Sequence, residues 1–269
     1  TRVKPGDHVA VEPAMPCGTC DQCLCGRPHT CRRLRFLGCP GQAEGCLAEY
    51  LVMPEACCIP VPPELSLELA AFVEPLAIGL YAARLAGPLQ GARIGILGAG
   101  PIGLSVLLAA RQLGAQGAYV TDKLEPRLEA ASRAGAVWTG NPNARDPVQA
   151  IAAREPLLLD VVFECCGQQS AVDQAIALLK PGGKLLLVGI PENDRVSFLI
   201  DMGRRKELCI QNVRRQCHCV EPAIALLASR QLDAGSLITH RFGFDRTLDA
   251  FELVAEYRAG VIKAMIHFG

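Results

Sequence analysis

The sequence is poor in aromatic residues and carries no excess of charge of either sign. Only 5% of its 269 residues are Phe, Trp or Tyr, and 27 basic side chains balance 27 acidic ones. The net charge of zero gives no support for nucleic acid or an anionic membrane as a partner, because both attract clustered positive charge. We therefore expect neither as a main partner.

The start of the sequence lacks two further features. Residues 1–12, TRVKPGDHVAVE, contain no apolar run of the kind that a secretory signal peptide needs. They also lack an initiator methionine, and we expect the sequence to be a piece of a longer protein. The 14 cysteines include two adjacent pairs, Cys57-Cys58 and Cys165-Cys166. This pattern favours reduced thiols in a cytoplasmic protein over a disulfide framework.

One long uncharged run is present, at residues 94–110. It contains Pro101 and four glycines, which suit a turn between core elements better than a lipid-facing helix. Half of all residues are hydrophobic, so the chain has enough apolar material for a sizeable core.

The same run belongs to a glycine-rich motif. A short apolar segment at 94–97 predicts a buried strand, and Gly98, Gly100 and Gly103 follow in the spacing G-x-G-x-x-G. An apolar segment from Ile102 to Leu113 predicts a helix. A second strand is expected at 118–121, and it ends on Asp122.

Each part of this motif has a physical role if a dinucleotide binds here. Gly98 permits the tight turn, Gly100 lets the backbone approach a pyrophosphate, and Gly103 lets the helix pack close to the strand. The helix start, with Pro101 and Ile102, faces the phosphate charge. Asp122 can accept hydrogen bonds from the adenosine ribose. The alternative is a glycine-rich turn in an ordinary α/β core.

Four cysteines near the N-terminus have a second informative spacing. Cys17, Cys20, Cys23 and Cys31 follow the pattern C-x2-C-x2-C-x7-C. Four thiolates in a short loop can close a tetrahedral zinc site with no open position, which predicts a structural metal. The alternative is a redox C-x-x-C, which usually lies beside a βαβ pattern that is absent here. Cys25 falls outside the ligand spacing, and His29 is expected at the surface. The alternative is that either residue substitutes for a ligand in a distorted site.

Glu74 interrupts an otherwise apolar stretch, LAAFVEPLAIGLYAA. A carboxylate that is buried alone is costly, so it must be paired, hydrogen-bonded or bound to a metal. The alternative is that Glu74 caps a helix that begins at Pro75, since proline suits the first helical turn.

The middle of the chain alternates between strand and helix patterns, which predicts a parallel sheet with helices on both faces. Strands are expected at 94–97, 118–121, 159–163, 184–188 and 208–212, and helices at 102–113, 125–134, 170–179 and 200–206. The head is β-like, with strands expected at 8–12 and within 44–52 and a helix N-cap at Ser66. The tail predicts a helix at 220–230, a strand at 237–242, a helix at 248–258 and a strand at 261–267.

These motifs together resemble the zinc-dependent, medium-chain alcohol and polyol dehydrogenases, and most of all the sorbitol (L-iditol) dehydrogenase branch. The matching segments, in family order, are GDHVAVEP, CGTCDQC, GCLAEYLVMP, FVEPLAIGLYAARLAG, GAGPIG, VTD, FECCG, KPGGKLLLVG and LITHRF. The resemblance implies a Rossmann domain at 77–213 inserted in a β-rich, GroES-like catalytic domain. That catalytic domain would comprise residues 1–76 and 214–269 and would be N-terminally incomplete.

The resemblance also implies roles for single residues. The four lobe cysteines match a structural zinc site, and Asp122 matches the residue that prefers NAD over NADP. Arg127 resembles an arginine near the adenosine ribose, with a solvated helix arginine as the alternative. Glu74 resembles the carboxylate at the catalytic zinc of the polyol branch, which is either a ligand or bridged to the metal by water.

Two further residues resemble parts of the substrate site. Phe36 resembles a pocket aromatic, although a core role is as good an interpretation. Arg215 resembles an arginine that faces substrate and nicotinamide, with an exposed Arg214-Arg215 pair as the alternative. Gln216 stands where the branch usually has tyrosine.

One part of the family pattern is missing from this sequence. The family's first catalytic zinc ligands, a cysteine and a Gly-His-Glu motif, lie before the GDHV turn, and none of the five histidines sits in such a motif. Glu74 alone does not hold a catalytic zinc, which needs about three protein ligands.

The resemblance implies a zinc-dependent oxidoreductase that transfers hydride between a secondary alcohol or polyol and NAD. It also implies a homodimer or homotetramer through the sheet edge near 208–213. The alternative is a non-catalytic NAD-binding protein or subunit. A metal-free NADPH reductase is disfavoured by Asp122 and the cysteine lobe.

Overall fold

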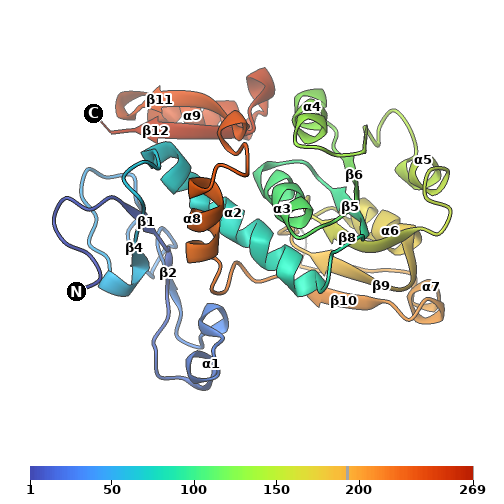
Figure 1. Ribbon diagram of the computed structural model, residues 1–269, viewed down its shortest axis with the longest axis horizontal. Coiled ribbons are helices and arrows are strands. Elements are labelled where there is room, and N and C mark those ends of the chain that lie inside the picture. Colours follow the sequence, from blue (N-terminus) through green and yellow to red (C-terminus); the bar gives the residue numbers. More distant parts are fainter. Residues whose placement is uncertain (192–193, 269) are drawn as a thin grey trace.

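The structure is a computed structural model that describes residues 1–191 and 194–268. A parallel sheet of six strands fills one half of the molecule, on the right in Figure 1. The strand order is β10-β9-β8-β5-β6-β7. The strands are β5 (Arg93–Leu97), β6 (Gly117–Thr121), β7 (Trp138–Gly140), β8 (Leu159–Glu164), β9 (Leu179–Leu187) and β10 (Cys209–Asn212). The first strand of this sheet, β5, therefore lies in its middle. Strands β6 and β7 are added on one side of β5, and β8, β9 and β10 on the other, which places a switch point between β5 and β8.

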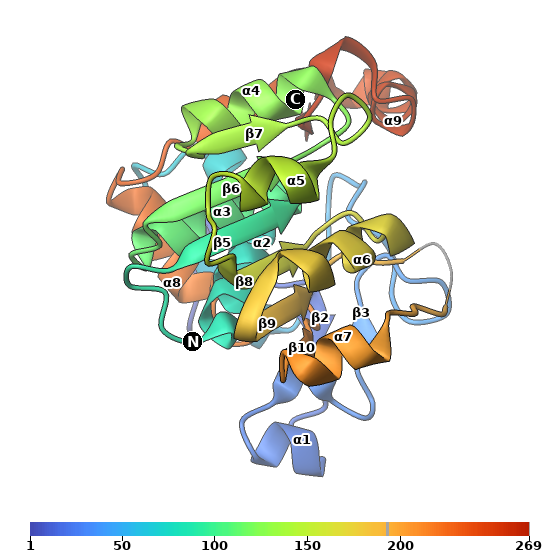
Figure 2. The ribbon, with the colours of Figure 1, turned by 90° about the vertical axis from the view of Figure 1, so that its right-hand side faces the viewer.

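Helices cover both faces of the sheet, as the alternating pattern predicted (Figure 2). Side chains alternate along β5, so that Ile94 and Ile96 join one core cluster and Leu97 joins the other. The first cluster is covered by α2 (Leu67–Ala86), α3 (Pro101–Gln112), α4 (Glu125–Arg133) and α8 (Val220–Ala228). The second is covered by α5 (Pro147–Ala152) and α6 (Gln169–Leu178), with α7 (Ile200–Arg205) beside α6. The sequence did not predict the short elements α5 and β7.

The head consists of short antiparallel pairs. Strand β1 (Val9–Val11) pairs with β4 (Cys58–Pro60), and β2 (Ala14–Met15) pairs with β3 (Arg35–Phe36). The short helix α1 (Asp21–Leu24) lies in the loop between β2 and β3. The prediction of a strand within 44–52 is wrong, because no described strand pairs with this segment. Tyr50 and Val52 are 91% and 97% exposed, and a strand needs a neighbouring backbone to take its hydrogen bonds.

Helix α2 crosses the molecule between the head and the sheet (Figure 1). Its N-cap is Ser66, as predicted, and the Ser66 hydroxyl accepts a hydrogen bond from the Leu69 N–H at 3.3 Å. Because the helix already begins at Leu67, Glu74 and Pro75 lie inside it, and the alternative in which Glu74 caps a new helix is wrong. By length and composition α2 could cross a membrane, but 56% of its most apolar window is buried inside the fold.

The tail lies apart from the six-stranded sheet. Strands β11 (Ile238–Gly243) and β12 (Lys263–His267) form a parallel pair covered by α9 (Thr247–Ala255), while α8 packs on α2. These four elements match the predicted ones with shifts of one to three residues. The predicted domain boundary at 76/77 falls inside α2, so one continuous helix carries the head's last segment into the sheet.

The contact between α2 and α3 depends on Gly79. A Cβ atom at this position would lie 2.5 Å from the backbone carbon of Ser105 in α3, which is far inside van der Waals contact. The absence of a side chain therefore sets how closely the two helices approach.

We predict that Gly79→Ala destabilises the protein by about 1–3 kcal/mol, since the two helices must separate to admit the methyl group. Gly203→Ala in α7 is the matched control, because its Cβ would meet nothing closer than 3.8 Å and alanine favours the helix by about 0.5–1 kcal/mol. Urea unfolding measures both. Equal stabilities of the Gly79→Ala protein and the wild type would contradict the predicted contact.

Candidate cofactor, metal and catalytic sites

The glycine loop lies at the carboxyl end of β5. Gly98 has φ +104°, a left-handed conformation that favours glycine, and its N–H donates to the Thr121 carbonyl at 2.8 Å. A Cβ at Gly103 would lie 1.8 Å from the Gly98 carbonyl oxygen. The first turn of α3 therefore packs against the loop at a distance that no side chain at this position would allow. Gly100 is the N-cap of α3, and Pro101 and Ile102 form the first helical positions.

A cavity of about 610 Å³ opens beside this loop. Its wall includes Gly98, Asp122, Arg127, Cys166 and Tyr257. The first four of these follow β5, β6 and β8, so the cavity lies at the carboxyl ends of strands on either side of the switch point. Open α/β sheets bind their ligands in such a crevice.

Asp122 is held rigidly in this wall. One carboxylate oxygen accepts the Ala99 N–H at 2.7 Å, and the other accepts the Leu124 N–H at 2.9 Å. The Arg127 guanidinium lies 3.7 Å from the same carboxylate. The Arg127 side chain is only 16% exposed, which disfavours the alternative of a solvated helix arginine.

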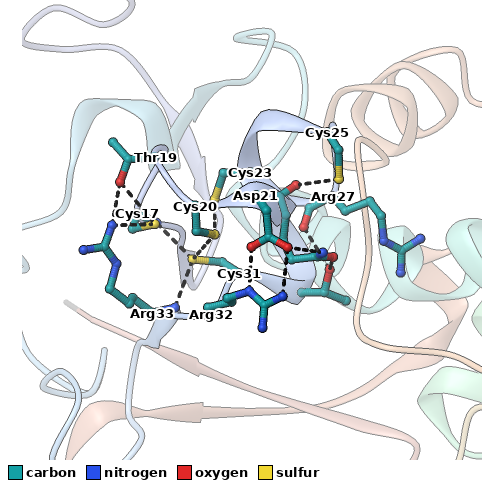
Figure 3. Close-up of polar contacts among 12 residues, drawn as sticks. Cys17, Thr19, Cys20, Asp21, Cys23, Cys25, Arg27, Cys31, Arg32 and Arg33 are labelled. Atoms are coloured by element: carbon teal, nitrogen blue, oxygen red, sulfur yellow. Dashed lines mark hydrogen bonds and ion pairs between the residues drawn. The ribbon is translucent and has the colours of Figure 1, made fainter.

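The four cysteines of the lobe meet in space (Figure 3). The sulfur atoms of Cys17, Cys20, Cys23 and Cys31 all lie within 4.8 Å of one another. The Sγ of Cys20 lies 3.6 Å from that of Cys23 and 3.8 Å from that of Cys31. Zinc–sulfur bonds of about 2.3 Å in a tetrahedron require sulfur atoms about 3.8 Å apart. The residues therefore fit a four-thiolate zinc.

Hydrogen-bond donors surround the same sulfur atoms. The Cys31 Sγ accepts the N–H groups of Cys17 at 3.2 Å and Arg33 at 3.4 Å. Hydrogen bonds from the Thr19 backbone and hydroxyl lower the pKa of the Cys17 thiol to about 5. Such donors favour the thiolate form that binds metal. Cys25 instead faces the Gln22 carbonyl, outside the cluster. The expectation that His29 lies at the surface is wrong: it is 6% exposed, and its Nε2 lies 3.0 Å from the Tyr81 hydroxyl.

A second group of charged residues gathers where the head meets α2 and the tail. The Arg215 guanidinium carbon lies 3.4 Å from the centre of the Phe36 ring. Burial raises the pKa of Glu74, and the positive charges of Lys263 and Arg215 partly oppose that rise. The Arg215 Nη1 is buried and has no hydrogen-bond partner among the described residues. The structure thus brings Glu74, Arg215 and Phe36 into one region.

Glu12 belongs to this region, although the sequence analysis did not single it out. Its carboxylate accepts the Ala14 N–H at 3.0 Å and a hydrogen bond from the Gln216 amide. The pKa of Glu12 is raised by burial first and also by the negative charge of Glu74. Gln216 accepts the Cys219 N–H at 3.0 Å, so it ties the Arg215 loop to the head. The one available signal was an acidic residue at the end of the strand predicted at 8–12, in GDHVAVEP.

The residues around Glu74 do not make a catalytic zinc site by themselves. Within residues 1–191 and 194–268, the cysteine lobe is the one group of three or more His, Cys, Asp or Glu side chains with the spacing of metal ligands. A catalytic zinc needs about three protein ligands and an open position. Glu74 can therefore supply one ligand at most, and the described residues do not hold a metal beside it on their own.

Comparison with known proteins places this combination of sites in one class. Residues 1–63 match the alcohol dehydrogenase GroES-like domain, and residues 101–229 match the zinc-binding dehydrogenase domain. The sorbitol dehydrogenase of Bacillus subtilis is 34% identical over 266 residues, which cover 98% of this chain and 75% of that protein.

Solved structures agree with the sequence matches. An Escherichia coli oxidoreductase of unknown specificity superposes with a TM-score of 0.95 at 33% identity, covering 100% of this chain and 77% of that one. A zinc-binding dehydrogenase of Sinorhizobium meliloti, bound to NADP, superposes with a TM-score of 0.92 at 30% identity, covering 99% and 78%.

The fold is thus that of the GroES-like and Rossmann-like zinc-dependent dehydrogenases. The chain belongs to the zinc-type alcohol dehydrogenase family, in which sorbitol dehydrogenases are among its relatives. It is a zinc-dependent oxidoreductase that acts on small-molecule alcohols with NAD.

We predict that Cys20→Ser removes one zinc ion per chain and lowers the thermal unfolding midpoint, because the remaining three thiolates no longer close the tetrahedron. Cys25→Ser, in the same lobe but outside the cluster, should keep both zinc and stability. Metal analysis of the purified variants measures the difference. Retention of zinc in the Cys20→Ser protein would argue against this site.

Proposed function

We propose that the chain oxidises a polyol or a related secondary alcohol, with the substrate held near Arg215 and Glu74. The observation that carries this proposal is the buried Arg215 Nη1, a donor with no partner among the described residues. A buried polar group without a partner is costly, and a hydroxyl of the substrate would satisfy it. A polyol offers further hydroxyls to the neighbouring carboxylates, whereas a simple alcohol would leave those charges unpaired.

Each residue of this region then has a distinct task. Arg215 donates to a substrate hydroxyl, and the Phe36 ring beneath its guanidinium holds it in place and keeps water away. Glu12 and Gln216 fix the loop that carries Arg215. Glu74 contributes a carboxylate to the reacting end, where it would be one ligand of a catalytic zinc. The Bacillus subtilis relative, named for sorbitol, supports the choice of a polyol.

The cofactor half of the proposal rests on the glycine loop and Asp122. NAD, when bound, accepts the hydride that leaves the carbinol carbon. The helix start after Gly100, with Pro101 and Ile102, takes the pyrophosphate. Asp122 accepts hydrogen bonds from the adenosine ribose, and its negative charge disfavours a 2′-phosphate.

The cysteine lobe serves a structural purpose in this proposal. Its four ligands leave no open position for a substrate. Zinc in the lobe stabilises the head, which supplies Phe36 and Glu12 to the alcohol site.

We also propose a homodimer or homotetramer formed through β10, in a cytoplasmic protein. This strand is one of the two edge strands of the six-stranded sheet, and Cys209 and Asn212 at its ends are exposed. An unpaired edge is a template for pairing. Large apolar side chains are exposed shortly before it, at Phe198, Leu199, Ile200 and Met202.

We predict that Arg215→Ala lowers kcat/KM for polyols by roughly 10- to 100-fold, the effect of losing a hydrogen bond to a charged donor. Arg214→Ala is the matched control, because this neighbouring side chain is exposed. NADH formation with a panel of polyols and simple primary alcohols measures both. No turnover of any alcohol by a protein that binds NADH would instead favour the non-catalytic alternative.

We further predict that Asp122→Ala relaxes the preference for NAD over NADP by about tenfold or more, since a negative charge no longer meets the 2′-phosphate. Asp122→Asn keeps the size of the side chain and should relax the preference similarly. The ratio of kcat/KM for the two cofactors is the measurement. An unchanged ratio in both variants would refute the role of the charge.

A further inference from the structure

A loop from the tail reaches the cofactor cavity. Residues 256–260, between α9 and β12, pack against α4, so that a Cβ at Gly260 would lie 3.1 Å from the Pro126 side chain. The loop places Tyr257 over Arg127, with the guanidinium carbon 5.0 Å from the ring centre. Tyr257 and Arg127 both line the cavity that contains Asp122.

The backbone of this loop is held in an unfavourable conformation. Tyr257 has φ 52° and ψ 33°, and Ala259 has φ 50° and ψ 28°, the left-handed region that non-glycine residues seldom adopt. Local contacts hold it there: Arg258 pairs with Glu256 at 2.8 Å, and the Val261 N–H donates to the Arg258 carbonyl at 3.1 Å. Strain of this kind gathers where the surrounding structure requires a particular placement.

Tyr257 buries little of its side chain and adds little to the hydrophobic core. Its side chain is 57% exposed, so burial of the ring does not explain the strained backbone. What the ring does contact is the cation of Arg127, which is itself 3.7 Å from the Asp122 carboxylate. The three side chains therefore form a row, from the exposed ring to the buried carboxylate.

We propose that Tyr257 is a positioning residue for the adenosine half of the cofactor site, delivered to the Rossmann domain by the tail. Its ring covers one face of the Arg127 guanidinium and keeps it beside Asp122, so that both groups are in place before NAD binds. The Arg127 Nε is buried without a hydrogen-bond partner among the described residues, so the packed ring replaces solvent around this side chain. This inference rests on the proposed NAD site.

Removing the ring exposes the guanidinium to water and frees it to leave Asp122. The cost falls on ligands that contact this pair, which are those with an adenosine moiety. A ligand that lacks adenosine and occupies only the nicotinamide half should not sense the change. This difference separates positioning from a general loss of structure.

The test compares NADH with reduced nicotinamide mononucleotide, which lacks the adenosine part, by fluorescence titration. We expect Tyr257→Leu to weaken NADH binding by about fivefold, the size of a cation–π contact at a partly exposed site. Tyr257→Phe keeps the ring and should bind as the wild type does. Phe251→Leu in α9, also an exposed aromatic (58%) but outside the cavity wall, is the matched control. Binding of the mononucleotide should not change in any variant.

A double-mutant cycle with Arg127→Met provides a second readout. In that background Tyr257→Leu should have no further effect on NADH binding, because the ring acts through the guanidinium. Three results overturn the inference: wild-type affinity in Tyr257→Leu, equal weakening of both ligands, or an undiminished Tyr257→Leu effect in the Arg127→Met protein. A wild-type protein that binds neither ligand would overturn the proposed NAD site itself.

Discussion

The close crossing of α2 and α3 at Gly79 sets the position of Glu74 relative to the glycine loop. Helix α3 carries the glycine loop at its N-terminus, and α2 carries Glu74 five residues before Gly79, which is about 7.5 Å along a helix. The same helix packs on β1, α8 and α3. The contact between these two rigid helices therefore helps to set the distance between Glu74, at the proposed alcohol end, and the turn proposed to receive the cofactor.

Buried charged groups are costly at the proposed alcohol end. Burial raises the pKa values of both Glu12 and Glu74, so ionised carboxylates there are less favourable than in water. The positive charge of Arg215 opposes this effect, and the amide of Gln216 satisfies Glu12, but one Arg215 nitrogen has no partner among the described residues. A protein core would be more stable with apolar residues in their place. The retained polar groups are consistent with a site that a hydroxylated ligand completes.

The sequence predicted features that depend on local patterns and failed where distant contacts decide. Buried strands, the glycine loop and the cysteine spacing each have a short-range signature, and the Ser66 cap was recognised from its neighbours. The strand expected within 44–52 failed because strand formation needs a partner, which residue types do not reveal. Pro75 looked like a helix start because proline is tolerated equally in the first turn and, where packing compensates, inside a helix. Tyr257 acquires its surroundings from residues that are far away in the chain, so no local pattern marked it. Glu12 had only the weak signal of an acidic residue at the end of a predicted strand, and its partner Gln216 lies about 200 residues away.

The tail connects the two ends of the site through a short length of chain. Tyr257 contacts Arg127 at the proposed adenosine end. Burial raises the pKa of Glu74 at the proposed alcohol end, and the charge of Lys263, six residues after Tyr257 in β12, partly opposes that rise. Between Tyr257 and Lys263 runs the strained loop that packs on α4. Strand β12 is paired with β11 along its length. A shift of residues 256–260 away from Arg127 would therefore either bend this pair or move Lys263. One short segment of the tail therefore contributes both Tyr257 to the wall of the proposed cofactor cavity and the charge of Lys263 near Glu74.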